Sequence, residues 1–222
     1  IDTIGIDGIN VYYSTGVNIA NNLIGYGNDG NFNSADDTVI GNDGIAVVYS
    51  GKTQVSGNKV AHTKRNGVYV EGAAGNVLSG NIVNFTGKSG MYLLNTAGAQ
   101  ILNNNIGTLG GNNNINGDGV LVENSNGASV KGNTIAKTKS TAAEIGSGVH
   151  ILNSNNVTVG GAAAADKNTI SNSEWDNVKV TGGNNVVVEG NDLDTATRVG
   201  VYARGTANMV ARNNDIDGAK MY

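Results

Sequence analysis

Two glutamates have a spacing that acid–base chemistry on a sugar can use. Glu71 and Glu123 stand at the same position of two copies of a repeat, and Leu94 stands at that position in the copy between them. If successive copies stack as neighbouring strands, the two carboxylates lie roughly 10 Å apart at the backbone. This spacing suits the carboxylate pair of an inverting glycoside hydrolase, although two solvated glutamates on a strand face would show the same pattern.

His150 is expected on the same strand face as Glu71 and Glu123. A general base or a metal site needs partners, and the chain's other histidine, His62, belongs to a different sheet of the repeat. We therefore expect His150 to be exposed and alone, while keeping it among the candidate ligand-binding residues.

Tyrosine and leucine side chains surround these groups. Tyr69, Tyr92 and Leu121 fall in one outward column, and Val48, Leu94 and Leu152 fall in the next. Soluble monomers seldom expose a patch of this kind, so we expect an insertion loop, another protein or a sugar to contact it. The candidate ligand or partner face consists of Tyr69, Glu71, Tyr92, Leu94, Leu121, Glu123, His150, Leu152, Tyr202 and Arg204.

One loop carries oxygen-bearing side chains at alternating positions. Calcium binds six to eight oxygens, and this loop offers the side chains of Asp29, Asn31, Asn33, Asp36 and Asp37. The loop lacks the terminal Glu of an EF-hand, and an ordinary polar loop is the alternative. Ca²⁺ is thus the one cofactor that the sequence suggests.

A repeat of at least 23 residues positions all these groups. Its copies begin at Gly8, Gly44, Gly67, Gly90, Gly119, Gly148, Asn177 and Gly200. An Asn follows each start after fourteen residues, except in the copy at Gly148, where residues 162–167 are inserted. These residues are Asn22, Asn58, Asn81, Asn104, Asn133, Asn168, Asn191 and Asn214. A fixed period of this length indicates stacked repeats, and the Asn column predicts a ladder of stacked amides.

Short apolar segments with a period of two predict strands rather than helices. In the copy at Gly67 the inward positions are Val68, Val70, Leu78 and Val83, and the other copies carry apolar residues at the same places. Each strand is too short for one copy to be stable alone. The sequence therefore predicts an all-β chain, a single-stranded right-handed parallel β-helix of about eight rungs that is roughly 38 Å long.

Composition narrows the function classes. The 222 residues are 39% hydrophobic and 14% charged, with 34 Gly, no Pro and no Cys. The net charge of -4 and the absence of a basic stripe argue against nucleic acid as a partner, and no apolar run is long enough to span a membrane. We interpret residues 1–222 as one domain, either a processed product or a segment of a longer chain.

Two short motifs carry a family resemblance. One is the strand opening, seen in Asp7-Gly8-Ile9, Asp43-Gly44-Ile45 and Asp118-Gly119-Val120, and the other is the turn Gly132-Asn133-Thr134-Ile135. The chain resembles the right-handed parallel β-helix repeat family, the superfold of pectate lyases, polygalacturonases, alginate epimerases and many bacterial surface proteins. The insertion between Val159 and Ser171 looks like one that is common in bacterial β-helical surface proteins. The resemblance implies an extracellular or cell-surface location.

The resemblance also implies where catalytic residues would lie. In the enzymes the substrate groove follows the outer face of the first sheet. Polygalacturonases carry clustered Asp there, and neither outward column of this chain contains one. Alginate epimerases carry Asp-Pro-His-Asp, which a chain without Pro lacks. Pectate lyases use an Arg beside calcium-binding Asp residues, but Arg204 is flanked in its column by Thr181.

These observations lead to two hypotheses. The first is a non-enzymatic structural or adhesive β-helix that stacks end to end, with itself or with the rest of a longer chain, into a stalk or fibre. The alternative is a polysaccharide-active enzyme (lyase, hydrolase or epimerase) or a carbohydrate-binding module that uses the outer face of the first sheet, with a surface polysaccharide as partner.

Overall fold

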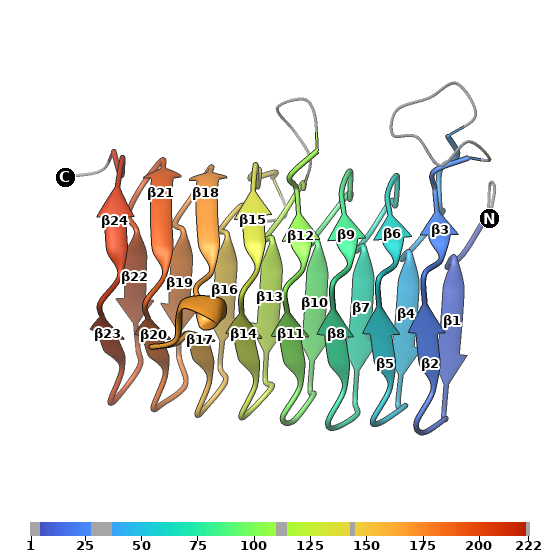
Figure 1. Cartoon of the computed structure of the whole chain (residues 1–222), viewed down its shortest axis with the longest axis horizontal. Helices are drawn as coiled ribbons and strands as arrows, with labels where there is room; N and C mark the ends of the chain where they lie inside the picture. The colour runs from blue at the N-terminus through green and yellow to red at the C-terminus, as the bar shows by residue number, and fades with distance from the viewer. Residues whose placement is uncertain (1–4, 28–36, 110–114, 143–144, 221–222) are drawn as a thin grey trace.

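The computed structural model describes residues 5–27, 37–109, 115–142 and 145–220, and strands wind through them in eight successive coils (Figure 1). Each coil contributes one strand to each of three parallel eight-stranded sheets. The predicted right-handed parallel β-helix is therefore confirmed.

The first sheet contains β1 (Ile9–Tyr12), β4 (Ile45–Val48), β7 (Val68–Glu71), β10 (Met91–Leu94), β13 (Val120–Glu123), β16 (Val149–Leu152), β19 (Val178–Thr181) and β22 (Val201–Arg204). The second contains β2 (Asn18–Ala20), β5 (Gln54–Ser56), β8 (Val77–Ser79), β11 (Gln100–Leu102), β14 (Ser129–Lys131), β17 (Thr158–Gly160), β20 (Val187–Glu189) and β23 (Val210–Arg212). The third contains β3 (Leu23–Ile24), β6 (Lys59–Val60), β9 (Ile82–Val83), β12 (Asn105–Ile106), β15 (Thr134–Ala136), β18 (Thr169–Ser173), β21 (Asp192–Ala196) and β24 (Asp215–Asp217).

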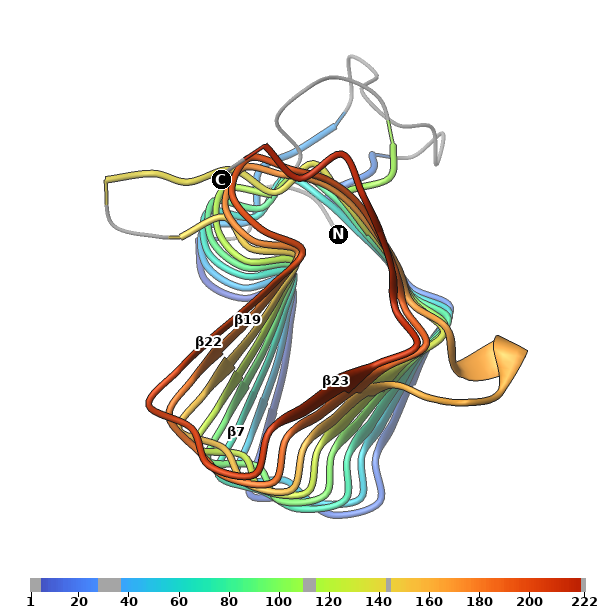
Figure 2. The same ribbon diagram turned by 90° about the vertical axis from the view of Figure 1, so that its left-hand side faces the viewer.

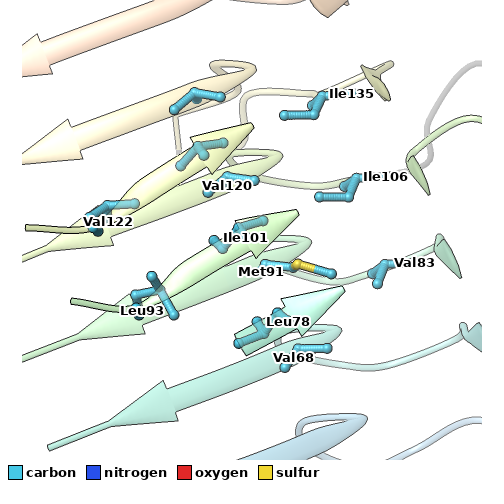
Figure 3. Packing of buried hydrophobic residues seen from close by; sticks show 14 of the residues in the cluster. Val68, Leu78, Val83, Met91, Leu93, Ile101, Ile106, Val120, Val122 and Ile135 are labelled. Carbon is cyan, nitrogen blue, oxygen red and sulfur yellow. The ribbon is translucent and has the colours of Figure 1, made fainter. Parts of the chain in front are cut away.

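The register of the first sheet follows the repeat. Val68 pairs with Met91, and Met91 pairs with Val120, so the residue after each start glycine falls in one column. Alternate side chains of each strand point inward, where they stack coil upon coil into one continuous core (Figure 3). Because each coil buries its apolar residues only against its two neighbours, the fold needs many coils to be stable.

The Asn ladder is confirmed along its whole length. In Asn81, for example, the backbone N–H and the side-chain Nδ2 both donate to Oδ1 of Asn104, at 2.9 and 3.0 Å, and Nδ2 also donates to the carbonyl of Val55. The left-handed backbone belongs to the residue before the ladder Asn, such as Gly80 with φ 63°, and not to the Asn itself. The exception is Lys167, which ends the insertion before Asn168 and has a φ of -60°. The ladder Asn therefore serves as a buried hydrogen-bonding group, and its neighbour makes the bend.

Insertions leave the coils at their corners (Figure 2). Residues 162–167 form a loop that carries the 3-10 turn η1 (Ala164–Asp166) between β17 and β18. Another long connection, between β15 and β16, emerges at the corner that precedes the first sheet. No helix among the described residues has the length and apolar character needed to cross a bilayer.

Candidate functional site

The outer face of the first sheet carries the predicted ligand face in two straight columns. One column runs Tyr69, Tyr92, Leu121, His150, Lys179, Tyr202, and the next runs Glu71, Leu94, Glu123, Leu152, Thr181, Arg204. The columns are those that the sequence predicted. The expectation of an exposed apolar patch is wrong in degree, because Tyr69, Tyr92, Leu121, Val48, Leu94 and Leu152 are all half-buried.

A hollow of about 300 Å³ lies over Leu121. Five predicted residues line it, namely Tyr92, Leu121, Glu123, His150 and Leu152. The structure adds Arg65, Asn66, Lys88, Ser89, Asp118 and Ile145. The remaining predicted residues, Tyr69, Glu71, Leu94, Tyr202 and Arg204, lie on the same face outside this Leu121 hollow.

His150 is neither exposed nor alone, so that expectation is wrong. Its side chain is buried, and its Nδ1 lies 3.0 Å from Oδ2 of Asp118. The other carboxylate oxygen of Asp118 accepts a hydrogen bond of 2.8 Å from the backbone N–H of Ser147. The second imidazole nitrogen, Nε2, is buried without a hydrogen-bond partner among the described residues.

This geometry has a chemical consequence. When the Asp118 carboxylate accepts a hydrogen bond from Nδ1–H of His150, Nε2 is the imidazole nitrogen with a free lone pair that can take a proton. Burial is the largest influence on the pKa of Asp118 and raises it, while the hydrogen bond and charge of His150 oppose that rise. An Asp–His pair of this kind can act as an oriented general base.

Asp118 was missed because it belongs to neither outward column. It is the residue before the start glycine of its coil, at the corner, and its side chain reaches the face of the next coil. The Asp-Gly pairs at the strand openings were a visible signal, since the same corner position holds Asp7, Asp43 and Asp176.

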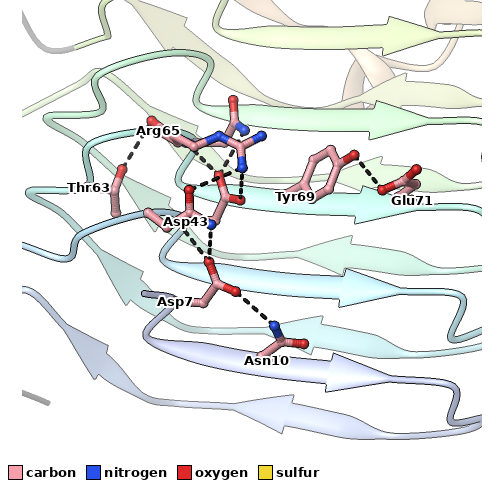
Figure 4. Close-up of polar contacts among 9 residues, drawn as sticks. Asp7, Asn10, Asp43, Thr63, Arg65, Tyr69 and Glu71 are labelled. Carbon is pink, nitrogen blue, oxygen red and sulfur yellow. Dashed lines mark hydrogen bonds and ion pairs between the residues drawn. The ribbon is translucent and has the colours of Figure 1, made fainter. Parts of the chain in front are cut away.

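On one side of the hollow, Arg65, which lines it, forms an ion pair with Asp43 (Figure 4). Arg65 Nη1 lies 3.6 Å from Oδ2 of the buried Asp43, and its guanidinium lies 5.7 Å from the centre of the Tyr69 ring. The hydroxyl of Tyr69 donates a 2.7 Å hydrogen bond to Glu71. Burial and this acceptor raise the pKa of Tyr69 above its ordinary range, so the phenol keeps its proton. Arg65 is half-exposed and leaves positive charge at the mouth of the hollow.

A related arrangement occurs on the other side. Arg198 Nη1 lies 3.6 Å from the buried carboxylate of Asp176, and its guanidinium lies 4.4 Å from the Trp175 ring and 5.0 Å from the Tyr202 ring. Lys179 follows His150 in the column, and burial lowers its pKa, against the opposing charges of Asp118 and Asp176. Cationic groups thus border the Asp118–His150 pair on both sides.

The two glutamates of the proposed carboxylate pair are not brought into one site. Glu123 lines the hollow and accepts a hydrogen bond of 2.5 Å from the hydroxyl of Tyr92. Glu71 lies two strands away, beyond Leu94, and is held by Tyr69. Tyr92, with Glu123 as its acceptor, is the polar group on the opposite side of Leu121 from His150.

The proposed calcium loop falls largely outside the described residues. Asp29, Asn31, Asn33 and Asp36 belong to residues 28–36, and calcium binding there stays a prediction. Asp37 is described, and its Oδ2 lies 3.2 Å from Nε2 of His62.

Comparison with protein families decides the relationship. The model of the periplasmic copper-binding protein (NosD) family matches residues 2–159, which is more than half of the chain. The chain belongs to this family. A model of the right-handed β-helix region matches residues 112–221 of this NosD-family chain. No curated protein sequence gives a significant match.

Solved structures share the fold at low sequence identity. The A-module of mannuronan C-5 epimerase AlgE4 from Azotobacter vinelandii is 18% identical, with a TM-score of 0.71 over 93% of this chain and 55% of its own. The periplasmic alginate epimerase AlgG is 14% identical, with a TM-score of 0.64 over 93% of this chain and 47% of its own. An α-1,3-glucanase from Streptomyces thermodiastaticus is 15% identical, with a TM-score of 0.51 over 85% of this chain and 46% of its own. The chain spans about half the length of these proteins.

The donor set does not fit the copper in the family's description. Copper prefers sulfur and imidazole ligands, whereas this chain has no Cys and two His. His150 lies in β16 and His62 in the connection after β6, and each is beside an Asp. Met91 is enclosed in the core. Within the described ranges, no three His, Cys, Asp or Glu side chains group together to hold a metal ion.

Proposed function

We propose that this NosD-family chain is a polysaccharide-active β-helix that binds an acidic polysaccharide along the outer face of its first sheet and removes a proton from a sugar held in the Leu121 hollow. The observation that carries the proposal is the buried Asp118–His150 pair, whose Nε2 makes no hydrogen bond with any described residue. A buried polar atom without a partner is unfavourable in a structural role, and a sugar bound in the hollow would supply the contact that Nε2 lacks.

The hollow supplies roles for its other residues. Asp118 orients the imidazole so that Nε2 accepts the proton. Arg65 and Lys88 neutralise a sugar carboxylate, which makes the adjacent C–H more acidic. The hydroxyl of Tyr92, which donates a hydrogen bond to Glu123, lies on the opposite side of Leu121 from the base. The outcome is epimerisation if the carbon regains a proton on its opposite face. It is β-elimination if the carbanion's electron pair forms the double bond, and the glycosidic oxygen leaves with the C–O electron pair and takes up a proton from water.

The names of the structural neighbours support this alternative better than a stalk or fibre, because they are epimerases and a glucanase. The family description and AlgG also support a location outside the cytoplasm, in the periplasm or beyond. The active group differs from the Asp-Pro-His-Asp arrangement that an alginate-epimerase resemblance implies, because this chain has no Pro and assembles its Asp and His from two coils.

Deuterium incorporation tests the proposal. The protein is incubated in D₂O with mannuronan, polygalacturonate and a neutral glucan, and the saccharides are returned to ordinary water so that only carbon-bound deuterium remains. We expect carbon-bound deuterium or new ultraviolet-absorbing unsaturated ends in an acidic polymer. The rate of this reaction should fall by about 10²- to 10⁴-fold in His150→Ala. The rate of the Asp118→Asn variant should lie between those of the wild type and His150→Ala.

Lys59→Ala is the matched control, because Lys59 is an exposed cation on β6 of the third sheet, away from the proposed binding face, and does not line the hollow. Hydrolysis without carbon-bound deuterium, no reaction with any polymer, or equal activity of His150→Ala and wild type would each overturn the proposal.

A further inference from the structure

Three tyrosines form an exposed cluster at the first two coils. Tyr12 is 55% exposed, Tyr13 is 71% exposed and Tyr49 is 44% exposed. The Tyr13 and Tyr49 rings stack with centroids 5.2 Å apart and planes 20° apart, and the Tyr12 ring meets Tyr13 edge-on at 4.2 Å. The sequence analysis did not single out this cluster, and it lies outside the Leu121 hollow.

The backbone at two of these tyrosines is strained. Tyr13 and Tyr49 have φ values of 46° and 50°, in the left-handed region that bulky side chains rarely adopt. The equivalent corner position in the other six coils holds Gly72, Asn95, Asn124, Asn153, Gly182 and Gly205, all with positive φ. Gly and Asn adopt this conformation readily, so tyrosine is the unfavourable choice for folding alone. Local strain of this kind concentrates at functional sites.

The neighbouring coil accommodates the cluster. The Tyr49 ring lies against Gly72, and a Cβ atom at Gly72 would come within 2.4 Å of its Cδ1. The Tyr49 ring therefore packs on the corner of the next coil, and Tyr13 extends the aromatic surface by one coil. The result is an exposed aromatic surface with hydroxyl groups, which suits a ring that has an apolar face and a polar edge.

The cluster is aligned with the proposed active face. Tyr12 pairs in register with Val48, and Val48 pairs with Glu71, so Tyr12 begins the column that contains Glu123. Three coil steps separate Tyr49 from Leu121, which is roughly 14 Å along the axis. A polysaccharide lying along this column would pass over both places.

We infer that Tyr12, Tyr13 and Tyr49 form a second sugar-binding subsite, which stacks on the pyranose rings of a polysaccharide whose distant part lies in the Leu121 hollow. This inference rests on the proposed function for the identity of the polymer. The subsite holds the polysaccharide and takes no part in proton transfer.

The test is affinity electrophoresis of the Tyr13→Asn/Tyr49→Asn variant in gels that contain mannuronan, polygalacturonate or a neutral glucan. Asn occupies the same corner in three other coils, so the variant should fold and should melt no lower than wild type. We expect binding to the polymer to weaken by roughly 10-fold or more. Turnover of a disaccharide, which is too short to extend over three coils, should not change.

Two control variants isolate the rings. Tyr13→Phe/Tyr49→Phe should retain the affinity, and Leu23→Ala removes an exposed apolar side chain from a different sheet of the same coil and should have no effect. Unchanged polymer binding in the Asn variant, or equal weakening by Leu23→Ala, would overturn the inference.

The outcomes also separate this inference from the proposed function. Loss of deuterium exchange in His150→Ala together with unchanged binding in the tyrosine variant would refute the subsite alone. Tyrosine-dependent binding without any exchange would support the subsite and refute the proton abstraction. No binding to any of the three polymers would refute both.

Discussion

Removing one buried ladder amide should cost far more than removing an exposed one. Asn104 is fully buried at the fourth coil. Its Oδ1 accepts hydrogen bonds from the backbone N–H and from Nδ2 of Asn81, and its own Nδ2 donates to the carbonyl of Leu78 and to Oδ1 of Asn133. Asn104→Ala removes all four bonds.

The magnitude follows from the groups left unpaired. The backbone N–H of Asn81 loses its acceptor, Nδ2 of Asn81 retains only Val55, and the carbonyl of Leu78 loses a donor. A buried polar group without a partner costs about 1–3 kcal/mol, so we expect a loss of about 3–6 kcal/mol in the free energy of unfolding. That is a large share of the roughly 5–15 kcal/mol that stabilises a typical folded protein.

Asn126→Ala is the matched control. Asn126 is exposed, and its Oδ1 accepts hydrogen bonds from the backbone N–H and Nδ2 of Asn155, which water can replace. We expect a loss below about 1 kcal/mol. Urea unfolding is followed by circular dichroism and by the fluorescence of Trp175, and coincident curves justify a single free energy. If the two variants lie within about 1 kcal/mol of each other, the reasoning about the ladder is refuted.

Three further predictions concern the corners of the coils. Burial raises the pKa of Asp118 above its unfolded value, so the folded protein keeps a proton that the unfolded chain has lost. The free energy of unfolding should fall as the pH rises from about 4 through the raised pKa. Asp118→Asn should flatten this slope by at most about 1.4 kcal/mol per pH unit in urea titrations, and an unchanged slope would contradict the assignment. Gly67→Ala should destabilise by about 1–3 kcal/mol or more, because the new Cβ would lie 2.2 Å from a core valine and 2.7 Å from a backbone oxygen, whereas Gly5→Ala meets no atom within 4 Å and should be neutral by thermal melting. Arg198→Ala should lower the melting temperature and shift the emission of Trp175, because it removes the cation over the indole and leaves a buried carboxylate unpaired; an unchanged emission spectrum would refute that contact.

Most of the fold could be predicted from the sequence because the repeat fixes register. Once Gly67 and Gly90 were aligned, alternation along a strand placed Val68 and Met91 inward and Tyr69 and Tyr92 outward, and the structure pairs them in that way. Each of the eight ladder Asn residues could be placed from the same alignment.

The site could be predicted only in part, because its decisive contacts come from corners. Alternation sets the direction of a side chain within a strand but not in a turn, where the local backbone angles set it. The sequence analysis therefore placed His150 on the correct face but missed the partner that Asp118 supplies from the preceding coil. It missed the Tyr13 and Tyr49 stack for the same reason, since both residues lie just beyond the strands.

The most direct test of the central claim is the ¹⁵N spectrum of the imidazoles, recorded with and without an acidic polysaccharide. The chain has two histidines, so the signals of His150 can be assigned with a single variant, and His62 serves as an internal reference. We predict that His150 carries its proton on Nδ1, toward Asp118, and that added polysaccharide shifts the Nε2 signal of His150 while His62 stays unchanged. A proton on Nε2 in the free neutral protein, or an Nε2 signal indifferent to saturating polysaccharide, would contradict the account.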